Sequence, residues 1–118
     1  MKLSFVKIQQ KTFLENVISE ADYIYLKSKL KEEDWNTLSE MIDKIYSRFT
    51  ARLYTLHPFN EKEIRICLLI KIDLKPSQIA PLIPCAKQTL TSIRKKMYER
   101  THNQQGSPEL WDEFIRNF

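Results

Sequence analysis

The sequence predicts an all-α fold: a long amino-terminal helical hairpin, a bundle of shorter helices and a carboxy-terminal helix. Helix formers such as Leu, Lys, Glu and Ile dominate the composition. The single glycine, Gly106, leaves few points at which strands could turn into hairpins. Apolar residues recur at spacings of three and four along most of the chain. A chain of 118 residues with 42% hydrophobic residues can bury one core, so we expect one compact unit.

The first predicted helix runs from about Leu3 to Lys31, without Pro or Gly. Its apolar positions fall at helical spacing: Val6, Phe13, Leu14, Val17, Ile18, Ala21, Ile24 and Tyr25. This stripe is wider than a short globular helix needs, which favours contact of part of it with a second copy of the chain or with an upstream domain. Packing in the core is the simpler expectation and comes first.

A second helix is predicted from the acids Glu32, Glu33 and Asp34 to Leu56, since acids favour a helix start. Its stripe is Trp35, Leu38, Ile42, Ile45, Phe49, Leu53 and Leu56. Pro58 cannot continue a helix and biases His57 towards an extended conformation. We therefore expect a helical hairpin over residues 1–57, which could dimerise or link to an upstream domain, and a second region over residues 58–118.

The third predicted helix begins after Asn60, because Asn60 and Glu63 form a capping-box pattern. It continues to about Ile72, where Asp73 is expected in a left-handed conformation. A short fourth segment follows from Ser77 to Ile83, with Pro76 in its first turn. Two further prolines, Pro81 near the end of that segment and Pro84 beyond it, oppose a longer helix.

The fifth predicted helix, from Lys87 to about Arg100, has an apolar side and a polar, basic side. Leu90, Ile93 and Met97 are expected to be buried. The expected opposite face is Lys87, Gln88, Thr91, Arg94, Lys95 and Tyr98. A sixth helix opens at Ser107 and Pro108. We expect Tyr98 to be half-buried and both tryptophans, Trp35 and Trp111, to anchor the core.

Positive charge is concentrated in the fifth predicted helix. The chain carries a net charge of +4. Within residues 87–100 the bases Lys87, Arg94, Lys95, Lys96 and Arg100 stand against one acid, Glu99, a local charge of +4. This density suits a polyanionic partner, although an ordinary solvated helix face has the same appearance.

Other function classes find little support in the sequence. No apolar run approaches a membrane span or a signal peptide, so we expect a cytoplasmic segment with no membrane contact of its own. Cys67 and Cys85 lie in apolar segments as structural thiols, and His57 and His102, expected to be exposed, lack metal-ligand spacing. No cofactor motif or catalytic constellation is present, so we expect no metal, no cofactor and no enzyme.

Three short helices in a row, with a tight turn before a basic third one, are typical of a helix-turn-helix. In that arrangement the second helix braces the third, whose exposed face fits the major groove. The predicted reading unit is therefore Phe59 to Arg100.

The residues of this unit resemble the LuxR-type helix-turn-helix without a gap. The matching positions are Phe59-Asn60-Glu61-Lys62-Glu63, Leu69-Ile70, Leu74, Ser77, Ile79-Ala80, Ile83 and Thr89-Leu90. The stretches 64–71 and 76–80 resemble the carboxy-terminal ends of large bacterial regulators in which tetratricopeptide repeats or a membrane-anchored sensor come first. Glu33-Asp34-Trp35, Phe49 and Leu53 extend this resemblance over most of residues 30–118.

The resemblance implies a bacterial transcription regulator that binds double-stranded DNA as a homodimer, the first or the sixth helix supplying the interface. It places Lys87, Gln88, Thr91, Arg94 and Lys95 on the DNA face, Thr89 near a phosphate, and Ser77 and Gln78 near the DNA backbone. Three positions depart from the pattern: Asp73 replaces a glycine, Ala86 a capping Ser or Thr, and Ile93 a common histidine.

Two functions therefore compete. In the first, Gln88, Thr91, Arg94 and Lys95 read base edges while Lys87, Lys96 and Arg100 contact phosphates. In the second, the helix-turn-helix has lost DNA contact, as Ala86, Pro81 and Pro84 suggest, and the chain is a protein interaction or dimerisation module. An open, uniformly positive face at Lys87, Arg94 and Lys95 would favour the first.

Overall fold

The computed structural model describes residues 30–118, and this part of the chain is all-helical, with no strand. Its helices are α2 (Glu32–Ile45), α3 (Phe49–Leu56), α4 (Glu61–Lys71), α5 (Pro76–Ile79), α6 (Lys87–His102) and α7 (Pro108–Asn117). The predicted helix over residues 3–31, and with it the hairpin, lies outside the described residues.

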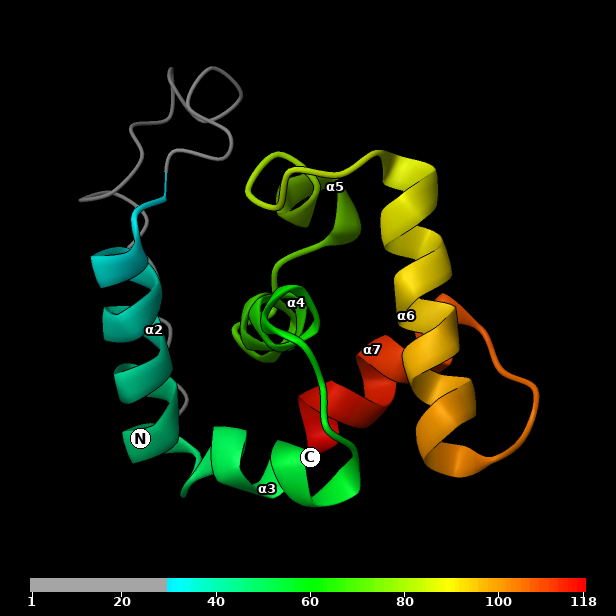
Figure 1. Cartoon of the computed structure of the whole chain (residues 1–118), viewed down its shortest axis with the longest axis horizontal. Coiled ribbons are helices and arrows are strands. Elements are labelled where there is room, and N and C mark those ends of the chain that lie inside the picture. The colour runs from blue at the N-terminus through cyan, green and yellow to red at the C-terminus, as the bar shows by residue number, and fades with distance from the viewer. Residues whose placement is uncertain (1–29) are drawn as a thin grey trace.

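Helix α4 occupies the middle of the molecule. Figure 1 views it along its axis, with α2 on one side, α6 on the other, and α3 and α7 nearer the bottom of the view. It packs against α2, α5 and α7, while α6 packs mainly against α7. Eight of its eleven residues are buried, which fits a helix covered on most sides.

Local signals in the sequence set several helix ends as predicted. The Asn60 side chain accepts a hydrogen bond from the Glu63 N–H at 2.8 Å, and the Glu63 carboxylate accepts one from the Asn60 N–H at 2.9 Å, which completes the capping box. Asp73 adopts φ 68° after α4, the predicted left-handed conformation. Ser107 caps α7 by accepting a hydrogen bond from the Leu110 N–H.

The prediction of one helix from residue 32 to residue 56 is wrong. The chain breaks after Ile45, with φ of 47° at Ser47 and 60° at Arg48, and restarts as α3. The Asp43 carboxylate holds the new start, since it accepts hydrogen bonds from the Thr50 N–H at 2.8 Å and the Thr50 hydroxyl at 2.6 Å. A side-chain cap inside a helical pattern thus competes with the apolar spacing.

The fourth segment is shorter than predicted. Only Pro76–Ile79 is helical, and a turn covers residues 80–84. Pro81 has no N–H to donate, so the helix cannot continue through it. Leu82 and Ile83 still face the core, because their N–H groups bond back to the Ile79 carbonyl at 2.9 and 3.1 Å.

The described residues share one hydrophobic core, to which all six helices contribute. Trp35 of α2, Leu53 of α3 and Ile79 of α5 belong to the same cluster as Leu90 of α6 and Trp111 of α7. Both tryptophans are buried as predicted. The core therefore crosses the predicted boundary at His57-Pro58, and the division of the chain there stays a prediction.

Candidate nucleic-acid interface

The outer face of α6 carries most of the predicted site. The helix has no Pro or Gly and ends at Asn103, which is left-handed with φ 52°. Ala86 provides no side-chain hydrogen bond at its start, as the sequence indicates. Seven predicted site residues on it are exposed: Lys87, Gln88, Thr89, Thr91, Lys95, Lys96 and Arg100. None of its three lysines forms an ion pair with another residue of 30–118.

Arg94 does not belong to this exposed face, and that part of the prediction is wrong. Its side chain is 4% exposed and binds Asp112 of α7 through two contacts, Nε to Oδ1 at 2.9 Å and Nη2 to Oδ2 at 2.5 Å. Arg94 stands four residues after Leu90 and three before Met97, which are both buried. This spacing puts Arg94 beside the apolar stripe. The sequence assigned it to the polar face because its side chain is charged.

Arg100 is exposed at its helix position but its guanidinium is occupied. Nη1 lies 3.0 Å from Oε2 of Glu63, a carboxylate that is almost fully buried and also completes the capping box of α4. This ion pair connects α6 to the start of α4. A phosphate would have to compete with Glu63 for Arg100, so the expected phosphate contact is weakened.

The bracing element of the predicted site is the four-residue helix α5. Ser77 and Gln78 are exposed on it, while Ile79 is fully buried against the core. The Gln78 side chain accepts a hydrogen bond from the Lys75 N–H at 2.8 Å, which orders the start of the helix. Contacts of α5 with both α4 and α6 fix its position.

Ser92 is an exposed polar residue of this face that the sequence did not lead us to predict. Ser92 stands four residues after Gln88 and three before Lys95, so the three side chains share one side of α6. The spacing of these three residues was enough to predict that Ser92 shares the face of Gln88 and Lys95. Thr91, by contrast, donates its hydroxyl to the Lys87 carbonyl at 3.1 Å and is left as an acceptor.

At the carboxy-terminal end of α6, Tyr98 and His102 pack against other aromatic side chains. Tyr98 is 9% exposed and stacks on His102, with ring centroids 4.0 Å apart. A Cβ at Gly106 would overlap the Tyr98 ring, so the one glycine of the chain allows this close approach. His102 also contacts Phe114, and His57 contacts Phe59. Both histidines are half-buried packing residues, and the expectation that they are exposed is wrong.

Two further properties of residues 30–118 bear on the site. No three His, Cys, Asp or Glu side chains of this part are grouped to hold a metal ion. None of its helices combines the length and the apolar character that crossing a membrane requires.

No family model, no curated protein and no solved structure matches the chain. The LuxR-type resemblance therefore stays an interpretation of the residues themselves.

Proposed function

We propose that this chain binds double-stranded DNA through the exposed face of α6. The observation that carries the proposal is the exposure of Lys87, Lys95 and Lys96 on one helix, without ion-pair partners among residues 30–118, beside Gln88 and Thr91. Lysines of this kind are available to neutralise phosphates, while polar side chains between them suit base edges.

The order of the elements supports a helix-turn-helix interpretation. Helix α5, the connection over residues 80–86 and helix α6 follow one another, and α5 packs against both α4 and α6. Helix α6 has 16 residues, long enough to lie along the major groove while its other side stays on the core. In this proposal the chain is the DNA-binding part of a cytoplasmic bacterial transcription regulator that acts as a dimer on paired half-sites.

The set of DNA-contacting residues differs from the one the sequence suggested. We assign base reading to Gln88, Thr91, Ser92 and Lys95, and phosphate contacts to Lys87, Thr89 and Lys96. Ser77 and Gln78 of α5 would approach the DNA backbone. Arg94 leaves the set because it is bound to Asp112 inside the protein, and Arg100 leaves it because its guanidinium is paired with Glu63.

The competing proposal, a protein interaction module, draws on the burial of Arg94 and the pairing of Arg100 with Glu63. These two ion pairs make the face less positive than the sequence suggested. The exposure of Lys87 and Lys95 favours the DNA-binding proposal.

A salt titration tests the proposal. Binding to a duplex should weaken with salt by about 0.9 logarithmic units per phosphate contact for each tenfold rise in salt. Lys96→Ala, which removes a proposed phosphate contact, should weaken binding and reduce that slope by about one contact. Fluorescence anisotropy with a labelled duplex, selected from random sequences, measures both quantities.

Lys44→Ala is the matched control, because Lys44 is an exposed lysine on α2, on the other side of α4 from α6 (Figure 1). It should change neither affinity nor slope. A slope near zero for the unmodified chain, or equal effects of the two variants, would contradict DNA binding through α6 and favour the interaction module.

A further inference from the structure

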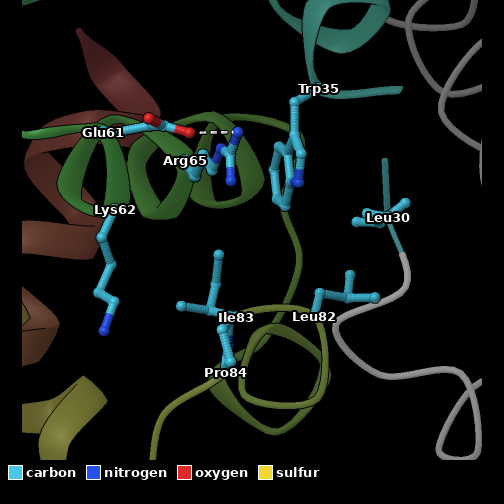
Figure 2. Close-up of a pocket in the computed structure, with 8 residues that line it drawn as sticks. All are labelled: Leu30, Trp35, Glu61, Lys62, Arg65, Leu82, Ile83 and Pro84. Carbon is cyan, nitrogen blue, oxygen red and sulfur yellow. Dashed lines mark ion pairs between the residues drawn. The ribbon is translucent and has the colours of Figure 1, made fainter. Parts of the chain in front are cut away.

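A partly enclosed apolar groove lies between α2, the start of α4 and the turn before α6. Its volume is about 300 Å³. Figure 2 shows Leu30, Trp35 and Leu82 around the same space, with Ile83 and Pro84 beside them. The charged residues Glu61, Lys62 and Arg65 form its rim.

Among residues 30–118, the rim has one cation available for a partner. Arg65 is occupied, because it pairs with Glu61 and with Glu32, the latter at 2.6 Å, and lies 4.9 Å from the Trp35 ring centroid. Lys62 is exposed and forms no ion pair within residues 30–118. An occupant of the groove would therefore be apolar on one side with an acidic group next to it.

The chain itself contains a segment with these properties, immediately before Leu30. Ala21, Ile24 and Tyr25 are spaced by three and four, so a helix would place them on one face. Glu20 and Asp22 flank Ala21. Leu30 lines the groove, and Ala21 precedes it by nine residues, which span up to about 3.5 Å each. The connection is therefore long enough to reach the groove.

We propose that Ala21, Ile24 and Tyr25 pack into this groove of the same chain, with one of the acids that flank Ala21 beside Lys62. Burial of this apolar surface stabilises the contact, and the attachment at Leu30 keeps the segment at high effective concentration. Because Leu82, Ile83 and Pro84 belong to the turn that leads into α6, the docked segment also supports that turn. The inference does not depend on DNA binding.

Fluorine NMR of the full chain, labelled with 5-fluorotryptophan, tests the contact. Trp35 lines the groove, and the fully buried Trp111 serves as an internal reference. Ile24→Ser with Tyr25→Ser should shift the Trp35 signal, leave the Trp111 signal in place and lower the urea midpoint. The matched control is Tyr23→Ser with Leu26→Ser, a similar change on the opposite helix face. This control should neither shift the Trp35 signal nor lower the urea midpoint.

Equal effects of the two variants, or no effect of either, would overturn the proposal. A Trp35 signal that changes on dilution would overturn it in favour of a second copy of the chain in the groove.

A cross-link covers the case in which the serine variant does not fold. Cys85 follows Pro84 at the groove, so a short bismaleimide should join Cys85 to Tyr25→Cys more efficiently than to Tyr23→Cys within one chain. Equal yields would also overturn the proposal.

Discussion

Arg94 and Asp112 form the ion pair that joins α6 to α7. Their side chains are 4% and 9% exposed, and both carboxylate oxygens accept hydrogen bonds from the guanidinium. Removing water from two charges is costly, and the bidentate geometry offsets this cost. At this position an arginine that looks like a DNA contact in the sequence fixes the orientation of the helix.

Loss of either partner of this pair should be strongly destabilising. Arg94→Met or Asp112→Leu alone leaves an unpaired buried charge and should lower the free energy of unfolding by about 3–5 kcal/mol. The double variant removes both charges, so its loss should be clearly smaller than the sum of the single losses. Urea denaturation of the four proteins measures this, and additive losses would show that the pair is not coupled.

The two cysteines should differ in reactivity. Cys67 is fully buried, with its sulfur 4.0 Å from that of Met97, and burial raises the pKa of its thiol far above the ordinary value. Burial also raises the pKa of Cys85, but this residue is half-buried and Lys62 opposes the shift. Since the thiolate is the reactive form, Cys85 should be modified first.

Alkylation of the folded protein at pH 8 should label one thiol per chain. Cys85→Ser should abolish the fast reaction and Cys67→Ala should leave it intact, with Cys67 reacting only after urea is added. Mass spectrometry identifies the labelled residue. Fast labelling of Cys67 in the folded protein would contradict the burial of its sulfur beside Met97.

At the scale of the elements, the start of α6 is its weakest point. Ala86 has the extended backbone of an N-cap, φ −69° and ψ 154°, but no side chain that can accept a hydrogen bond. The first N–H groups of the helix next to the proposed DNA face are therefore without a side-chain cap. This is the part of the motif on which the second candidate function depends.

Ala86→Ser should strengthen this start. The hydroxyl can accept a hydrogen bond from the N–H of the second or third residue of the helix, so the free energy of unfolding should rise by about 1 kcal/mol. Ala80→Ser is the control, because the same substitution at the end of α5 caps no helix start and should bring no gain. Thermal unfolding compares the two, and an unchanged midpoint for Ala86→Ser would show that capping does not limit α6.

At the scale of the whole molecule, two basic side chains hold the end of α7, Arg52 from α3 and Lys71 from the end of α4. Arg52 donates hydrogen bonds to the backbone oxygens of Tyr46 at 2.6 Å, Ser47 at 3.0 Å and Phe118 at 2.8 Å. Lys71 donates to those of Ile115 and Arg116 at the end of α7. Cations at a helix carboxy terminus also stabilise its dipole. Of these contacts, the Arg52–Phe118 hydrogen bond joins the two parts of the predicted domain division.

Arg52→Lys should lower the free energy of unfolding by about 1–3 kcal/mol, because a lysine keeps the charge but cannot donate to three oxygens in the fixed geometry of a guanidinium. Arg48→Lys is the matched control, since Arg48 is an exposed arginine at the break just before α3. It donates no side-chain hydrogen bond within residues 30–118. Urea denaturation measures both. Equal losses would show that Arg52 contributes only its charge.

The sequence alone determined the helical class of residues 30–118 and most of the helix ends. The capping box at Asn60, the left-handed Asp73 and the Ser107 cap involve partners within four residues of one another, so local chemistry is enough to predict them. The exposed lysines of α6 followed equally from their helical spacing.

Only the tertiary structure decided which polar groups are buried and where the second predicted helix breaks. Arg94 turns inward because Asp112, eighteen residues away, meets it from α7, and Arg52 satisfies the carbonyls of the break while it binds Phe118, sixty-six residues away. A buried charge is stable only with a partner, and helical periodicity carries no information about partners on other elements. For that reason the sequence identified α6 as the candidate DNA-facing helix, but the packing of α7 against it decided that Arg94 is buried while its lysines remain exposed.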